Sequence, residues 1–213
     1  MLESIETFVK GRMQGDSTGH DWFHVDRVRK LALHIGEIER ADLMICETAA
    51  LVHDLIDDKL ISDEGAALDE VVQLLRNNGM NSDDLDHVVE IITTMSFSSN
   101  SGAGMSTLEG KVVQDADRLD ALGAIGIART FMFAGAKSEA MYNPEIEART
   151  GTMSKDEYRE GESTAINHFY EKLFKLKDLM NTEEGRRIAD NRHRNMERFV
   201  DQFVTEWDGK DVE

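Results

Sequence analysis

The chain has 213 residues, 40% hydrophobic and 31% charged, so it can bury a core without covalent cross-links and is too apolar to be a disordered protein. Its 42 acidic residues outnumber its 24 basic ones and give a formal charge of -18, which repels a nucleic-acid backbone, so we expect no nucleic-acid polymer as a partner. Arg129 and Thr130 interrupt the longest apolar run, which falls short of the roughly 20 residues of a membrane span, so we expect no membrane partner.

The sequence favours a cytoplasmic location. The first residues, Met1 to Glu6, have neither the basic start nor the apolar run of an export signal. The single cysteine, Cys46, cannot form an internal disulfide, which fits a reducing compartment. Because no histidine or other base neighbours Cys46 in the sequence, we expect a buried structural thiol and not a nucleophile.

Charge is distributed unevenly along the chain. Residues 37–90 hold 15 acidic and three basic residues, whereas residues 172–198 hold eight basic and five acidic ones. The first region is therefore suited to cations, and the second could face anions.

Apolar residues recur at helical spacing along the whole chain, and a single proline leaves the helices almost uninterrupted, so the sequence predicts an all-α protein. No stretch alternates for long enough to be a strand. Helices are expected around residues 5–13 and 25–35, at 41–56, at 66–78 closed by Gly79, at 83–95 opened by Asn81 or Ser82, and at 108–134 with a break at Gly123.

Two long loops and two further helical stretches are expected in the second half of the chain. Residues 96–106 are polar and glycine-rich and predict a first loop, and residues 135–151, which contain the proline, predict a second. Apolar residues between 166 and 180 then follow a heptad-like rhythm, and Thr182 is placed to cap a last helix.

Metal-type ligands lie at four places on or beside the expected helices. They are His20 with His24, His53 with Asp54, Asp57 with Asp58, and the group Asp115, Asp117 and Asp120. His24 shares one helical face with apolar residues, so its side chain is expected to point into the bundle. His53 and Asp54 follow an apolar run, and imidazoles and carboxylates placed among apolar residues resist burial unless a cation lies between them.

Each of these residues also has an alternative interpretation. His24 and His53 could be core histidines bonded to backbone carbonyls, and Asp54, Asp57 and Asp58 could form a solvated helix end. Taken singly, each alternative is the commoner case; the apolar setting of the whole set is what argues against it.

The ordered set of His24, His53 with Asp54, and Asp117 resembles the HD-domain superfamily of metal-dependent phosphohydrolases. The likeness is closest to the small bacterial HD proteins of the YpgQ and YedJ type and covers nearly the whole chain. It rests on three segments: His-Asp-Trp-Phe-His-Val-Asp-Arg-Val from His20, Ala-Asp-Arg-Leu-Asp-Ala-Leu-Gly-Ala-Ile-Gly-Ile-Ala-Arg from Ala116, and His-Phe-Tyr-Glu-Lys-Leu from His168.

The resemblance implies an HD-domain helical bundle with additional C-terminal helices. It places the metal-binding helical core at residues 1–135 and packs the loop and helices of residues 136–213 on the same core, as a single domain overall. It also implies one divalent metal ion, held by His24, His53, Asp54 and Asp117. Two imidazoles and two carboxylates suit manganese first, with iron, cobalt, nickel, zinc or magnesium as alternatives.

Further residues are candidates for roles in catalysis and substrate binding. Asp57 and Asp58 look like the acidic pair that follows the His-Asp motif in alarmone hydrolases, so either is a candidate general base. Arg27, Lys59 and Arg118 are candidates for binding substrate phosphate, with ordinary surface ion pairs as the alternative. His20, His168 and Lys172 are weaker candidates for substrate contacts.

The activity implied is hydrolysis of a nucleotide by attack of a metal-bound water, most specifically pyrophosphohydrolysis of a (d)NTP to the monophosphate and pyrophosphate. A phosphomonoesterase or phosphodiesterase on another small phosphate stays open. So do a regulatory module that keeps the metal as a clamp and a helical interaction protein without metal. The residues do not determine the base, the sugar or the phosphate number, and they leave a homodimer open.

Overall fold

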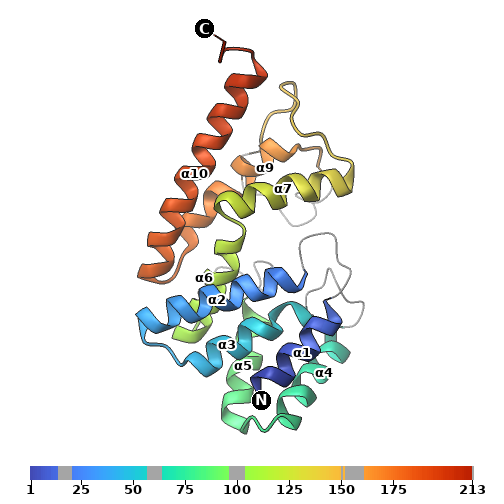
Figure 1. Cartoon of the computed structure of the whole chain (residues 1–213), viewed down its shortest axis with the longest axis vertical. Coiled ribbons are helices and arrows are strands. Elements are labelled where there is room, and N and C mark those ends of the chain that lie inside the picture. Colours follow the sequence, from blue (N-terminus) through green and yellow to red (C-terminus); the bar gives the residue numbers. More distant parts are fainter. Residues whose placement is uncertain (14–20, 57–63, 96–103, 150, 152–160, 213) are drawn as a thin grey trace. The chain divides into compact units, whose positions relative to one another are not determined.

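The computed structural model describes residues 1–13, 21–56, 64–95, 104–149, 151 and 161–212, and every regular element within these ranges is a helix (Figure 1). The predicted all-α fold is confirmed. No single helix among these residues is long and apolar enough to cross a membrane. One bent pair, formed by α6 (Leu108–Asp120) and α7 (Gly123–Lys137), meets the length and composition criteria together, as buried core helices of soluble proteins also do.

Contacts divide the chain into two compact units. The first comprises Met1–Asp117 together with the short segment Asn181–Gly185, and the second comprises Arg118–Met180 and Arg186–Glu213. The division that the sequence suggested, near residue 135 within a single domain, stays a prediction.

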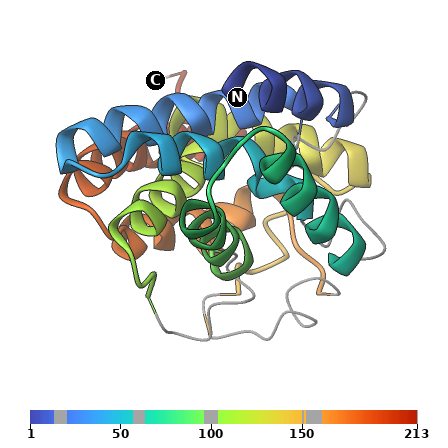
Figure 2. The ribbon, with the colours of Figure 1, turned by 90° about the horizontal axis from the view of Figure 1, so that it is seen from below.

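The first unit is a bundle that forms around α2 and α3. Its elements are α1 (Leu2–Arg12), α2 (Trp22–Glu39), α3 (Leu43–Val52), the 3₁₀ helix η1 (His53–Ile56), α4 (Glu64–Asn77), α5 (Ser82–Thr94) and most of α6 (Leu108–Asp120). α2 packs along α3, and α3 also packs against α1 and α5 (Figures 1 and 2). α3 is therefore the central helix, and six of its ten residues are fully buried.

Helix ends in this unit follow local capping chemistry. Asn81 accepts a hydrogen bond from the Asp84 amide at 3.0 Å and opens α5, and Gly79 closes α4 with φ of 85°, as predicted. One expected end is wrong: the helix predicted to run to Ile56 stops at Val52 and tightens into the 3₁₀ turn of η1. This tighter turn begins at His53.

The second unit contains α7 (Gly123–Lys137), α9 (Ala165–Glu171), the 3₁₀ helix η2 (Leu173–Leu179) and α10 (Glu183–Trp207) from Arg186 onward. α7 runs three residues further into the predicted loop than the Ala134 end we expected from the sequence, with Gly135 inside the helix. The heptad-like stretch is not one helix, because the backbone breaks at Lys172 and continues as η2.

The break between α6 and α7 depends on Gly123. Its φ is 72°, and a Cβ atom there would lie 3.0 Å from Cγ of Arg192. The Arg192 guanidinium donates to the carbonyl of Leu119 at 2.5 Å, next to the end of α6. Glycine, which has no Cβ atom, therefore accommodates both the positive φ and the close approach of the Arg192 side chain.

A buried carboxylate holds the loop before α9. Glu171 accepts hydrogen bonds from the amide, Nε and Nη2 of Arg149 at 3.0, 2.9 and 2.9 Å, and from the Ser163 hydroxyl at 3.0 Å. Burial raises the pKa of Glu171, but the hydrogen bonds and charge of Arg149 and the bond from Ser163 outweigh it, and the pKa lies below its usual value. The carboxylate is therefore ionised at neutral pH.

Asp115 ties the segment Asn181–Gly185 to the first unit. This fully buried carboxylate accepts from the amide and side chain of Asn181 at 2.9 and 2.8 Å, and from the amide and hydroxyl of Thr182 at 2.8 and 2.7 Å. The Thr182 hydroxyl in turn accepts from the Gly185 amide at 3.0 Å, which confirms its predicted role as a helix cap. A Cβ on Gly185 would lie 2.4 Å from Oδ2 of Asp115, so only glycine fits there.

Replacing Asp115 tests whether its hydrogen bonds with Asn181 and Thr182 stabilise the fold. Asp115→Asn puts an N–H donor where donors already converge and leaves buried N–H groups unpaired, so we expect the free energy of unfolding to fall by about 3 kcal/mol. Urea denaturation measures the change. Asp86→Asn, an exposed acid on α5, is the matched control and should stay within about 0.5 kcal/mol of the wild type. Equal stability of the two variants would contradict the role given to Asp115.

Candidate metal centre

Four side chains of the first unit converge on one small volume. His24 comes from the first turn of α2, His53 and Asp54 open η1 directly after α3, and Asp117 lies on α6. The first three are buried, at 1, 7 and 4% exposure, whereas the Asp117 side chain is 41% exposed. The cluster is therefore closed on three sides by the bundle and open at Asp117.

Distances within the cluster are short and similar. Nε2 of His24 lies 3.3 Å from Nε2 of His53, 3.3 Å from Oδ2 of Asp54 and 3.5 Å from Oδ1 of Asp117. Nε2 of His53 lies 3.3 Å from Oδ1 of Asp54 and 3.9 Å from Oδ1 of Asp117. One ligand atom each from His24, His53 and Asp117 therefore fits within 4.8 Å of the others.

Backbone contacts orient both histidines. Nδ1 of His53 lies 2.8 Å from the carbonyl oxygen of Ala50, so Nδ1 carries the hydrogen and Nε2 turns its lone pair to the cluster. The Asp21 side chain accepts from the His24 amide at 2.9 Å and starts α2 three residues before that ligand. The position of Asp21 before an apolar helix was a readable signal for this cap.

The donor set fits a divalent cation. Bonds of about 2.1 Å from a metal to nitrogen or oxygen separate neighbouring ligand atoms by roughly 3.0 Å in an octahedron and 3.4 Å in a tetrahedron, and four of the five distances lie close to these values. A buried carboxylate beside two buried imidazoles is also costly unless positive charge compensates it. Asp54 is therefore not part of a solvated helix end, which was the alternative interpretation from the sequence.

The other acids of α6 have different partners. Asp115 holds the segment Asn181–Gly185, and Asp120 is a buried acid that accepts from Nη1 of Arg129. Of the three acids that the sequence grouped on this helix, only Asp117 joins the cluster of the first unit. The sequence does not distinguish them, because the partners of Asp115 lie 66 and 67 residues further along the chain.

Several predicted site residues lie elsewhere. His20, Asp57, Asp58 and Lys59 fall outside the described residues. Arg27 is half-buried on α2, one turn after His24. Arg118, His168 and Lys172 belong to the second unit, where Nη1 of Arg118 donates to the carbonyl of Leu179. Their roles toward a substrate stay predictions.

Cys46 and His168 have shifted pKa values that limit their chemistry. Burial first, and then the charges of Glu109 and Asp42, raise the pKa of the fully buried Cys46 thiol to about 12, so a thiolate does not form at neutral pH. The expected structural thiol is confirmed. Burial first, and then the charge of Lys172, lower the pKa of His168 to about 4, so this imidazole is neutral at pH 7.

Comparison with known proteins identifies the family. A family model for the HD domain matches residues 22–122, a range that contains all four side chains of the cluster. The chain is 46% identical to the Bacillus subtilis protein YpgQ, over 99% of this chain and 96% of YpgQ. The chain belongs to the HD domain family. This confirms the resemblance that the motifs predicted.

Solved structures agree with this assignment. The crystal structure of Bacillus subtilis YpgQ in complex with ADP matches this HD protein with a TM-score of 0.78 and 44% identity, over 97% of each chain. An HD-superfamily hydrolase from Bacillus thuringiensis matches with a TM-score of 0.77 and 43% identity, over 97% of this chain and 96% of that one. This HD protein therefore has the fold of a metal-dependent hydrolase superfamily, with a candidate metal site at His24, His53 and Asp117.

Removing one ligand tests the centre. We expect His53→Ala and Asp54→Ala to lose the bound divalent metal while the helical circular dichroism persists, because the remaining ligands hold an ion weakly. Elemental analysis after gel filtration measures the metal content. Asp86→Ala, an exposed acid outside the cluster, should keep the wild-type content. Stoichiometric metal in both ligand variants would show that these residues are not ligands.

The neutral state of His168 predicts a pH dependence of stability. Its pKa is lower in the folded chain than the ordinary 6.5, so unfolding takes up a proton below pH 6.5 and stability is lost as the pH falls toward 4. Between pH 7 and pH 5 we expect the wild type to lose about 2 kcal/mol more unfolding free energy than His168→Gln, which has no such proton to take up. Urea denaturation at the two pH values measures the difference. Equal losses would mean that the imidazole is not held neutral.

Proposed function

We propose that this protein is a metal-dependent phosphohydrolase that acts on nucleotides, and specifically a (d)NTP pyrophosphohydrolase. The observation that carries the proposal is the convergence of two imidazoles and two carboxylates of the first unit, open at Asp117. The nucleotide substrate is supported by YpgQ, which has been crystallised with ADP and is 44% identical to this chain.

His24, His53, Asp54 and Asp117 would hold one divalent ion, with manganese as the first candidate. Asp54 contacts both imidazoles through different oxygens, which supports its inclusion beside the three residues that lie within reach of one another. When bound, the ion supplies Lewis-acid chemistry: it lowers the pKa of water and offsets charge on phosphoryl oxygens. Four protein ligands would leave coordination positions for water and substrate.

The chain's own residues then position and move protons. His53 is held by the Ala50 carbonyl through Nδ1, so its ring cannot turn away from the centre. In the proposed reaction, a water oxygen attacks the α-phosphorus, the bond from that phosphorus to the bridging oxygen breaks, and pyrophosphate leaves. Asp57 or Asp58, which follow His53 and Asp54 by four residues, accepts the proton of the water.

Basic residues next to ligands in the sequence would bind the phosphates. Arg27 follows His24 by one helical turn, and Arg118 directly follows Asp117. Lys59, His20 and Lys172 are further candidates. His168 could contribute only a hydrogen bond at neutral pH, because its pKa of about 4 leaves it uncharged.

A panel of nucleotides and metals tests the proposal. The protein is incubated with ribo- and deoxynucleoside mono-, di- and triphosphates and with Mn²⁺, Mg²⁺, Co²⁺, Ni²⁺ or Zn²⁺, and products are identified by mass. A monophosphate with pyrophosphate is the expected pair. Inorganic phosphate would instead indicate a phosphomonoesterase, turnover of a phosphodiester a phosphodiesterase, and metal binding without turnover a regulatory module.

Two sets of variants separate proton transfer from phosphate binding. Asp57→Asn and Asp58→Asn preserve side-chain volume, so the variant that removes the base should lose roughly 100- to 10,000-fold in kcat with unchanged metal content. Arg27→Ala and Arg118→Ala should mainly raise KM, unless their contact tightens in the transition state. Asp69→Asn, an exposed acid on α4, is the matched control.

Steady-state kinetics on the best nucleotide and elemental analysis measure both effects. Near-native kcat in both Asp→Asn variants would exclude these acids as the base. Loss of metal from either variant would instead make that residue a fifth ligand.

A further inference from the structure

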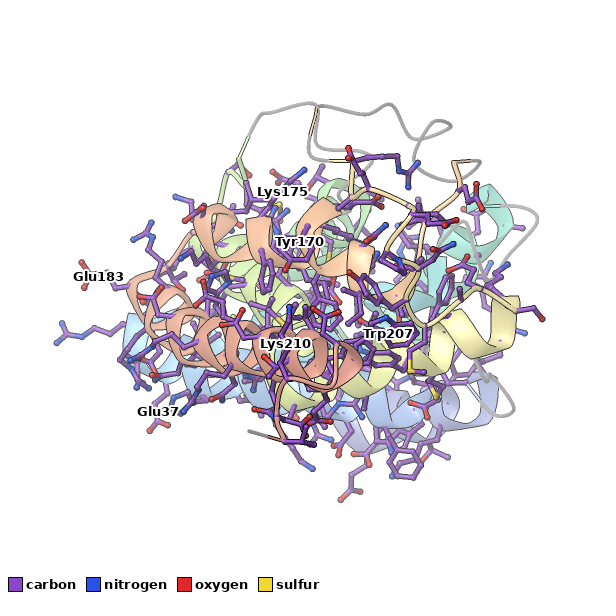
Figure 3. The ribbon with its side chains drawn as sticks, turned by 90° about the horizontal axis from the view of Figure 1, so that it is seen from above. Glu37, Tyr170, Lys175, Glu183, Trp207 and Lys210 are labelled. Carbon is purple, nitrogen blue, oxygen red and sulfur yellow. The ribbon has the colours of Figure 1, made fainter. Side chains whose placement is uncertain are left out.

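The second unit contains a groove of about 950 Å³ between α10 and the stretch formed by α9 and η2. Tyr170 and Phe174 line one side, and Arg194, Arg198 and Asp201 of α10 line the other. Figure 3 labels Tyr170 on the stretch that runs beside α10. No ligand of the metal cluster lines this groove, so the function proposed above leaves it unexplained.

The two arginines are held in place without an opposing charge. Nε of Arg194 donates to the carbonyl of Asp190 at 3.2 Å, and its Nη2 donates to Asn191; Nε of Arg198 donates to the carbonyl of Arg194 at 3.3 Å, and its Nη2 donates to Asn195. Neither guanidinium forms an ion pair with a carboxylate of the described residues. Both arginines are exposed, and in a chain with a formal charge of -18 two such cations one helical turn apart form a positive patch that can bind an anion.

Aromatic surface faces the same groove. Tyr170 is 41% exposed and rests edge-on against Phe174, with ring centroids 5.3 Å apart. The ring of His193 also packs edge-on against Phe174, with ring centroids 5.1 Å apart. The Tyr170 ring is therefore a supported, partly open apolar surface on which a planar group can stack.

The two acids of the groove differ in availability. The Glu197 carboxylate lies 3.1 Å from Nε2 of His193 and is already paired. Asp201 has no hydrogen bond or ion pair to its carboxylate among the described residues. Asp201 lines the same groove as Tyr170, and burial and then the charge of Asp201 raise the pKa of the Tyr170 hydroxyl. Asp201 can accept hydrogen bonds from ligand hydroxyls.

We propose that this groove is a second binding site, for a nucleoside diphosphate or triphosphate, separate from the metal cluster. The phosphates lie against Arg194 and Arg198, the base stacks on Tyr170, and the ribose hydroxyls donate to Asp201. Adjacent cations, an aromatic surface and one acceptor match the three parts of this ligand class in charge and polarity. The proposal does not rest on the hydrolytic function.

Binding of ADP in the presence of EDTA tests the site, because chelation removes metal-dependent binding at the cluster. We expect isothermal titration calorimetry to show ADP binding that falls at least tenfold in the double variant Arg194→Gln with Arg198→Gln. Tyr170→Ala should weaken ADP similarly, whereas Tyr170→Phe keeps the ring and should bind as the wild type does. Arg76→Gln, an exposed arginine on α4, is the matched control and should not change the affinity.

Pyrophosphate and adenosine resolve the two halves of the ligand. Both should bind more weakly than ADP, with pyrophosphate sensitive to the arginine variants and adenosine sensitive to Tyr170→Ala. ADP binding that is unchanged in the double variant overturns the proposal. So does pyrophosphate that binds as tightly as ADP, since the groove would then be a simple anion site.

A third outcome concerns a second copy of this chain. If the arginine variants change the sedimentation coefficient but not ADP binding, the groove is a surface for self-association and the nucleotide proposal is wrong. Failure of the hydrolytic function would leave these measurements unaffected, because they are made without metal and without turnover.

Discussion

Two buried imidazoles and a buried carboxylate converge at one point of the apolar bundle, and burying these groups together is costly unless positive charge compensates the carboxylate. This constraint explains the arrangement of the first unit. α2, the junction of α3 with η1, and α6 must each bring a side chain to the same point, and each is fixed there by a contact of its own. Asp21 caps α2, the Ala50 carbonyl orients His53, and Asp115 anchors α6. The centre and the bundle therefore stabilise each other.

The same centre is asymmetric in its exposure. His24, His53 and Asp54 are shielded by the bundle, whereas the carboxylate of Asp117 reaches solvent. Within the first unit, the cluster is therefore open to solvent at Asp117. A divalent ion at this centre would be held by His24, His53, Asp54 and Asp117, with Asp117 as the exposed member of the set.

Local chemistry could be predicted from the sequence, and long-range pairing could not. The caps at Asn81, Gly79 and Thr182 follow from residue types within three positions of a helix end, and each was predicted. The ligand motif was also readable, because His24, His53, Asp54 and Asp117 stand in an order typical of one family.

The roles of Asp115 and Glu171 were not predicted. The partners of Asp115 lie 66 and 67 residues away in the sequence, and those of Glu171 lie 8 and 22 residues away. No periodicity connects either residue with its partners. The 3₁₀ turn that begins at His53 was not predicted either.

The hydrogen bonds of Asp115 with Asn181 and Thr182 have a consequence for folding during synthesis on the ribosome. Asn181 and Thr182 are synthesised after the whole of residues 118–180, yet they complete the hydrogen bonding of a carboxylate buried in the first unit. A nascent chain that has emerged only as far as α7 therefore carries the four clustered side chains but keeps Asp115 unpaired. Final closure of the metal-binding unit is a late event in synthesis, and no cut at a single peptide bond separates the two units intact.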